Sequence, residues 1–130
     1  MNAQDVMKMI QENEVRFVDL RFTDTRGKEH HVGLPVSAFE EEHFEQGHPF
    51  DGSSLAGWKG IQASDMILMP EPSTAYLDPF FDEATLVITC DVVEPSDGKG
   101  YDREPRSIAK RSLIHLCRCR RSPLCLNRRW

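Results

Sequence analysis

The sequence predicts a small α+β domain built from about four strands and several short helices. Three observations support this prediction: a helical period near the N-terminus, two alternating segments around a turn, and a strand-like run over residues 85–93. The chain has 130 residues, of which 39% are hydrophobic, enough for one domain with a modest core. It has no strand–helix–strand rhythm and no glycine-rich phosphate loop.

Apolar residues recur at helical spacing over residues 3–13, which predicts a short amphipathic helix. Residues 18–22 alternate between apolar and charged side chains, the period of a strand with one buried face. Turn-forming residues fill 23–28, and residues 29–34 can return beside the first strand. Together these segments predict a β-hairpin that Pro35 ends.

Ser37 and Glu40 have the spacing of a capping box, so a short acidic helix is predicted from there to about Phe44. The glycine-rich stretch 46–65 is predicted to be a long ordered loop. Its apolar anchors are Phe50, Leu55, Trp58 and Ile61. A loop of this length without secondary structure is usually functional or disordered.

Residues 66–69 predict a buried strand, and three prolines interrupt the segment that follows. In the run 85–93, alternate residues from Leu86 to Val92 form one apolar face that includes Cys90, expected to be a buried, reduced thiol. Pro105 suits the first turn of a helix, with Asp102 or Arg103 near its N-cap.

The charge is divided unevenly along the chain. Residues 1–110 hold all 21 acidic side chains and 10 of the 16 basic ones, a net charge of −11, whereas residues 111–130 hold six arginines and no acid. No apolar segment approaches the roughly 18 residues that a membrane helix needs, so no membrane association is expected. No signal peptide is recognised, and a cytoplasmic location is expected.

The segment Phe50–Ser54 reads Phe-Asp-Gly-Ser-Ser, and after eight residues it is followed by Ala63, Ser64 and Asp65, and then by Leu68. This pattern resembles the N-terminal signature of glutamine synthetase. Further segments resemble bacterial type I members of that family, and the resemblance covers roughly residues 1–111; these segments are 18–25, 56–61, 65–70 and 100–109.

The resemblance implies a β-grasp-like domain with a mixed sheet over residues 1–104, and the start of a helix leading to a catalytic domain over 105–111. In the full-length family enzyme, ATP phosphorylates the glutamate side chain and ammonia attacks the acyl phosphate, with Mg²⁺ or Mn²⁺ as cofactor. The family forms dodecamers whose active sites lie between subunits. ATP and metal are not expected to bind this chain, and its expected partners are other glutamine synthetase subunits, with glutamate and ammonium as substrates.

The resemblance also assigns roles to the loop. Asp51 is carried over as the catalytic carboxylate that binds ammonium and removes its proton, and Ser54 as a second ammonium ligand. Gly52, Ser53 and Trp58 are expected to shape the loop, with Trp58 packing in its own domain rather than meeting a neighbour. The plainer alternative is that Asp-Gly-Ser-Ser is ordinary turn chemistry.

Four histidines could suggest a metal site, but their spacing is irregular and the adjacent pair His30 and His31 faces opposite sides of a strand. The other two are His43 and His48. Surface positions are the better interpretation, and no metal ligand is assigned. The acidic run 40–42 is expected to be a solvated helix face.

Residues 112–130 do not resemble the family and are interpreted as a divergent basic tail, disordered or translated out of frame. A zinc site from His115, Cys117, Cys119 and Cys125 fits no common spacing. Nucleic-acid binding by the arginines is disfavoured, because Trp130 is the tail's only aromatic residue.

Three functions follow from the sequence. The first is the N-terminal domain of a glutamate–ammonia ligase that lends its ammonium loop to a neighbouring subunit, with this chain inactive alone. The second is a non-catalytic module that docks on full-length subunits. The third is a basic-tailed nucleic-acid binder.

Overall fold

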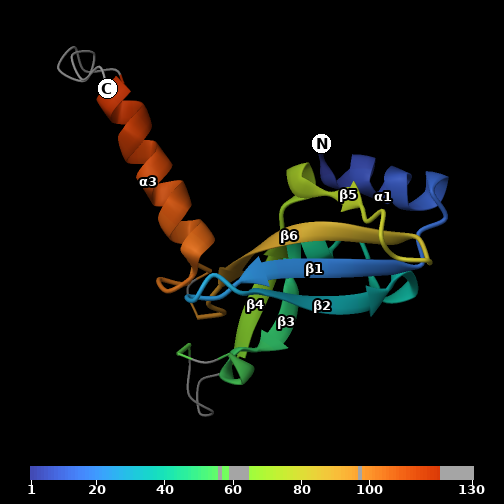
Figure 1. The fold of residues 1–130 in the computed structure, drawn as a ribbon, viewed down its shortest axis with the longest axis horizontal. Helices are drawn as coiled ribbons and strands as arrows, with labels where there is room; N and C mark the ends of the chain where they lie inside the picture. Colours follow the sequence, from blue (N-terminus) through green and yellow to red (C-terminus); the bar gives the residue numbers. More distant parts are fainter. Residues whose placement is uncertain (56, 59–64, 97, 121–130) are drawn as a thin grey trace.

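The computed structural model describes the backbone of residues 1–55, 57–58, 65–96 and 98–120, and side chains as far as Leu113. Figure 1 shows a curved sheet with one helix beside it and a second helix leaving it. The elements are α1 (Ala3–Glu12), β1 (Phe17–Thr23), β2 (Glu29–Pro35), the 3-10 turn η1 (Val36–Ala38), α2 (His43–Gln46), β3 (His48–Asp51), η2 (Gly52–Ser54), β4 (Asp65–Pro70), η4 (Pro72–Thr74), β5 (Tyr76–Leu77), β6 (Thr85–Val93) and α3 (Pro105–Arg120).

The strands form one mixed sheet in the order β2-β1-β6-β4-β3, with β5 pairing on β6. β1 and β6 are parallel, and the other neighbouring strands are antiparallel. This arrangement confirms the α+β class and the mixed sheet with short helices. The predicted hairpin is also confirmed, because β1 pairs with β2 from Phe17 opposite Pro35 to Thr23 opposite Glu29.

The hairpin turn is organised by Asp24, which is 5% exposed. One carboxylate oxygen accepts hydrogen bonds from the amides of Arg26 at 2.8 Å and Lys28 at 2.9 Å, and the other lies 3.0 Å from His30 Nε2. An aspartate that satisfies its own turn amides in this way fixes the turn locally. Gly27 provides the positive φ of +80° that the turn requires.

The core lies between α1 and the sheet. α1 buries Val6 and Ile10, and its N-terminus has a reciprocal capping box between Asn2 and Asp5, which confirms the predicted first helix. β6 is the most buried strand, as its central place in the sheet requires. Cys90 is buried and unpaired, which confirms its expected state.

Two local predictions are wrong. No helix begins at Ser37; a single 3-10 turn ends at Ala38, and α2 begins only at His43. The reason is Phe39, which is 3% exposed and extended, with its ring 5.2 Å from His43 and 5.4 Å from Phe44. Burying that ring interrupts the helix, and the acidic residues 40–42 are exposed in the turn before α2.

The stretch 46–65 is not wholly a loop, because His48–Asp51 forms strand β3. The sequence did not predict this strand because Gly47 and Pro49 are residues that usually end strands. β3 lies at the end of the sheet order, where proline is tolerated because the missing amide faces no neighbouring strand. Gly47 has φ +76°, and a Cβ there would lie 2.2 Å from Ile67 Cγ2. Ile61 and residues 63–64 lie outside the described residues.

α3 projects away from the sheet in Figure 1. Asp102 and Arg103 lie just before its first turn, as predicted, and the capping side chain is that of the next residue: the buried Glu104 carboxylate accepts from the amides of Arg106 at 3.0 Å and Ser107 at 2.5 Å. α3 continues to Arg120, so the tail's expected disorder does not hold for 112–120. Residues 121–130, with Cys125, lie outside the described residues, as do the side chains of 114–120. No described helix is long and apolar enough to cross a membrane.

Candidate functional site

Asp51 is the last residue of β3, at the edge of the sheet where β3 and β4 meet. The antiparallel register places it directly opposite Asp65, the first residue of β4. Both residues are exposed. Like charges directly opposite on neighbouring strands repel each other. A cation held between them would remove that repulsion, so this end of the sheet favours a positively charged ligand.

The turn after Asp51 is built by its own polar groups. Asp51 Oδ1 accepts a hydrogen bond from the amide of Ser53 at 2.8 Å, and the Ser54 hydroxyl donates to the Asp51 carbonyl oxygen at 2.8 Å. Gly52 is buried beneath the turn. The structure therefore brings Asp51, Ser53 and Ser54 together. The exposed Ser54 oxygen retains lone pairs that can accept from a ligand.

Trp58 lies at the base of this loop and packs inside the domain. It is 6% exposed, and its ring centroid lies 5.2 Å from Tyr101, 6.0 Å from Phe22 and 6.4 Å from Phe50. Its indole nitrogen is buried, and in the described part of the chain it has no hydrogen-bond partner. A buried donor in this state costs stability.

Arg103 anchors the loop from the other end of the chain. Its Nη1 donates to the carbonyl oxygen of Gly57 at 2.8 Å and lies 3.4 Å from that of Trp58. Sequence reasoning missed this contact, since 46 residues separate Arg103 from Gly57. The only hint was that Arg103 falls within the segment 100–109, one of those that resemble the family. The loop and the segment before α3 therefore form one unit.

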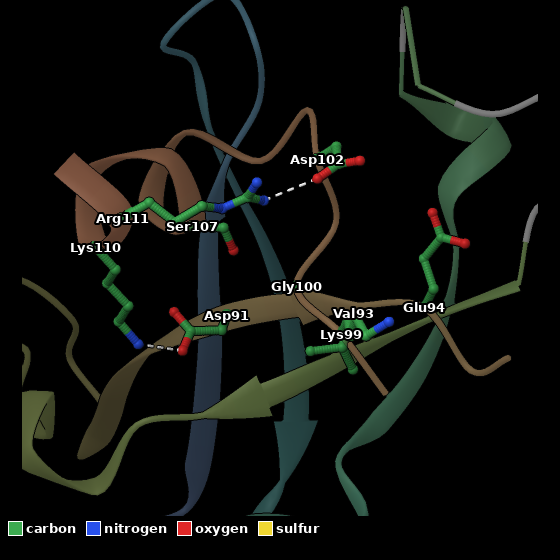
Figure 2. Close-up of a pocket in the computed structure, with 9 residues that line it drawn as sticks. All are labelled: Asp91, Val93, Glu94, Lys99, Gly100, Asp102, Ser107, Lys110 and Arg111. Atoms are coloured by element: carbon green, nitrogen blue, oxygen red, sulfur yellow. Dashed lines mark hydrogen bonds and ion pairs between the residues drawn. The ribbon is translucent and has the colours of Figure 1, made fainter. Parts of the chain in front are cut away.

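Figure 2 shows an open cavity of about 740 Å³ beside the first turns of α3. Its charged residues come from β6, from the connection that follows it and from α3. Lys110 is paired with Asp91, and Arg111 Nη2 lies 2.9 Å from Asp102. The first of these ion pairs attaches α3 to β6, and the second attaches it to the connection that precedes it. They occupy the charges that a ligand would need, so we assign the cavity a structural role.

His30 and His31 meet different carboxylates, whereas the rings of His43 and His48 stack on each other with centroids 5.8 Å apart. His30 meets Asp24 and stacks on Phe22 at 5.7 Å, whereas His31 Nδ1 lies 2.7 Å from Asp19. Burial, and secondarily the neighbouring His43, lower the pKa of His48. Across residues 1–55, 57–58, 65–96 and 98–113, no group of three or more His, Cys, Asp or Glu is placed to hold a metal ion.

Comparisons with known proteins agree with this geometry. A family model described as glutamine synthetase, beta-Grasp domain, matches residues 14–95. The chain is 62% identical over 116 residues to a glutamine synthetase of Methylococcus capsulatus and 60% identical over 116 residues to one of Escherichia coli. It is 69% identical over 115 residues to a 3-hydroxylaminophenol mutase of Cupriavidus pinatubonensis.

These alignments cover 88–89% of this chain but 24–25% of the relatives, so the chain spans about a quarter of their length. Among solved structures, a Plasmodium falciparum glutamine synthetase superposes with a TM-score of 0.80 at 25% identity, over 89% of this chain and 22% of that one.

Proposed function

This chain belongs to the glutamine synthetase family as an example of its β-grasp domain, and from that premise we propose that its Asp51 loop binds ammonium at an active site completed by a second subunit. The observation that carries the proposal is the exposed pair Asp51 and Asp65, set opposite each other at the end of β3 and β4.

The chemistry requires a carboxylate that does more than attract the cation. Ammonium has no lone pair, so it must lose a proton before it can attack an acyl phosphate. With lysine as a stand-in for ammonium, transfer to an ordinary aspartate is uphill by roughly 6.5 pKa units, or about 9 kcal/mol. Burial raises the pKa of a carboxylate and lowers that of an ammonium, so closure by a neighbour would reduce this gap.

We assign Asp51 to binding and deprotonation, Ser54 to a second ammonium contact and Asp65 to the local negative potential. The turn bonds of Gly52 and Ser53 keep Asp51 in a fixed position, and Trp58 supports the loop from below. ATP and the divalent metal would be held by the part of the family protein that these residues do not match. These 130 residues alone are therefore predicted to form no glutamine.

A chimera tests these roles directly. Residues 1–111 would replace the matching segment of the Escherichia coli enzyme, and glutamine formation would be measured with ATP, glutamate, Mg²⁺ and ammonium. We expect Asp51→Asn to lower kcat/KM for ammonium by about 10²–10⁴, the usual range for a lost general base. Ser54→Ala should cost roughly tenfold, equivalent to about 1.4 kcal/mol. The exposed Glu41 provides a control, and Glu41→Gln should leave activity unchanged.

The choice of nucleophile separates proton removal from simple attraction. Hydroxylamine is largely neutral at pH 7 and needs no base before it attacks. If Asp51 is the base, Asp51→Asn should lose far more activity with ammonium than with hydroxylamine. Equal losses with both nucleophiles would contradict the assignment, as would an active Asp51→Asn chimera.

A second candidate follows from the relative named 3-hydroxylaminophenol mutase, which is 69% identical over the shared region. That name describes a rearrangement that consumes no ammonium. The same chimeras, assayed with 3-hydroxylaminophenol, would distinguish the two reactions. Loss of both activities in Asp51→Asn would indicate a structural role for the carboxylate rather than an ammonium-specific one.

A further inference from the structure

A groove lies at the end of the sheet where β1 and β6 begin, since Phe17 and Thr85 are paired there. It is an open cavity of about 410 Å³, and we call it the aromatic–acidic groove. The side chains that matter for its chemistry are Phe17, Asp19, His31, Phe81, Asp82 and Glu83. None of these residues takes part in the Asp51 loop.

The aromatic part of the groove is unusually exposed. Of the lining rings, Phe81 is 55% exposed and Phe17 42%, and Phe80, which precedes Phe81 in the chain but does not line the groove, is 91% exposed. A single exposed apolar residue needs no explanation, but a contiguous group of this kind marks an interaction surface. Aromatic faces attract cations as well as apolar groups, and arginine more often than lysine.

The acidic part of the groove complements a cation. The Asp19 carboxylate, with its side chain 7% exposed, is fixed by Arg21 Nε at 2.9 Å and His31 Nδ1 at 2.7 Å. Glu83 pairs with Arg16 at 3.0 Å, and both side chains are about half exposed or more, so water screens this pair. Asp82 is exposed and makes no ion pair within the described part of the chain. Asp82 and Glu83 can therefore accept from an incoming guanidinium.

We propose that the aromatic–acidic groove binds the arginine-rich C-terminal segment, residues 111–130, of a second copy of this chain. Charge complementarity identifies this occupant: residues 1–110 carry a net charge of −11, and residues 111–130 carry six arginines without an acid. A guanidinium can stack on an aromatic ring and donate to carboxylates at the same time, which matches both halves of the groove.

Helix α3 starts at the opposite end of β6 from the groove. β6 has nine residues, so its two ends lie roughly 26–30 Å apart. The groove is at its first residue, whereas α3 leaves from beyond its last and projects from the sheet (Figure 1). The helix carries its later residues about 24 Å further along its axis. The α3 backbone that carries residues 118 and 120 therefore runs away from the groove of its own chain.

The contact joins two different surfaces, the groove of one copy and the tail of the next. Such head-to-tail contacts form rings when the rotation closes and open chains when it does not. Because the contact depends on charge, added salt should weaken it. The expected species are therefore concentration-dependent oligomers that dissociate at high ionic strength.

Sedimentation velocity on the full chain tests the proposal without any assay of activity. It would be run under reducing conditions from 5 to 200 μM, in about 50 mM and 500 mM NaCl. We expect self-association at low salt only. The double reversal Asp82→Lys with Glu83→Lys should raise the dissociation constant at least about tenfold, and so should Phe81→Ser. Reversal of two acids that do not line the groove, Glu42→Lys just before α2 with Glu45→Lys within it, is the matched control and should leave association unchanged.

A charge-swap experiment distinguishes a loss of binding from misfolding of a single variant. The triple change Arg118→Glu, Arg120→Glu and Arg121→Glu should abolish association by itself. A chain that carries both this change and the groove reversal should associate again, because the two charges have been exchanged. A chain that stays monomeric at 200 μM in low salt would overturn the proposal. Association that is unchanged by the groove reversal would also overturn it. So would a chain that stays monomeric while its tail binds DNA equally well with and without the groove reversal.

Discussion

Substitution of Trp58 tests whether the base of the Asp51 loop is held by packing or by a hydrogen bond. Trp58→Ala removes a buried ring from contact with Tyr101, Phe22 and Phe50, and changes of this kind cost about 3–5 kcal/mol. Trp58→Phe keeps one ring in the same place. It gives up part of the buried area, about 1–2 kcal/mol, but it also removes the buried indole N–H, which has no hydrogen-bond partner among the described residues.

An unsatisfied buried donor costs about 1–3 kcal/mol, so the two effects of Trp58→Phe nearly cancel. We expect its unfolding free energy to lie within about 1 kcal/mol of the wild type, whereas Trp58→Ala should lose at least about 3 kcal/mol. Urea unfolding followed by far-UV circular dichroism measures both. Trp130→Phe, the chain's other tryptophan, controls for changes that are general to indole removal.

The refuting result is specific. If Trp58→Phe destabilises the domain as much as Trp58→Ala, the indole nitrogen contributes a bond in solution and the packing argument fails. If Trp58→Ala costs less than about 1 kcal/mol, the aromatic cluster does not hold the loop. A selective loss of chimera activity in Trp58→Ala, with stability preserved, would instead indicate a direct functional role for the ring.

Three further predictions concern the frame of the site. Gly47→Ala should destabilise the domain by at least about 1–2 kcal/mol in thermal unfolding, because φ is +76° and the new Cβ would meet Ile67. The hydrogen bond from His30, followed by a backbone amide, lowers the pKa of Asp24 below its usual 3.8, so the stability it contributes is present above that pH and is lost as the pH falls through the lowered pKa. Asp24→Asn should therefore flatten the acid limb of a stability profile below about pH 4. Burial raises the pKa of the Cys90 thiol well above its usual range, so a thiol reagent should modify Cys90 in the native chain only as fast as it unfolds, and Cys90→Ala should remove that slow phase.

Local patterns in the sequence were sufficient where one segment determines its own structure. The helical period of α1 and the turn chemistry around Asp24 are of this kind, and both are present as expected. The capping-box spacing at Ser37 failed because burial of Phe39 outweighed a local preference. β3 was missed because proline and glycine usually end strands, and only the position at the sheet's edge makes them acceptable.

The residues of the candidate site also fall into two groups: those that the local sequence identifies and those that only the folded structure places. Asp51 and Ser54 could be identified from the sequence because their residue types and spacing resemble a family pattern. Asp65 could not be given a role, because its place opposite Asp51 depends on the register between two strands. Arg103 could not be connected to the loop either, since that contact exists only after residues 101–104 have folded against Trp58.

The parallel pairing of β1 with β6 has a consequence for how this domain is made. Residues that are neighbours in the sheet, such as Phe17 and Thr85, are synthesised far apart in time. Until residues 85–93 have been translated, the edge of β1 that pairs with β6 stays unpaired. Chaperone contacts and misassembly between nascent chains should concentrate in that interval, and β6 acts as the element that ends it.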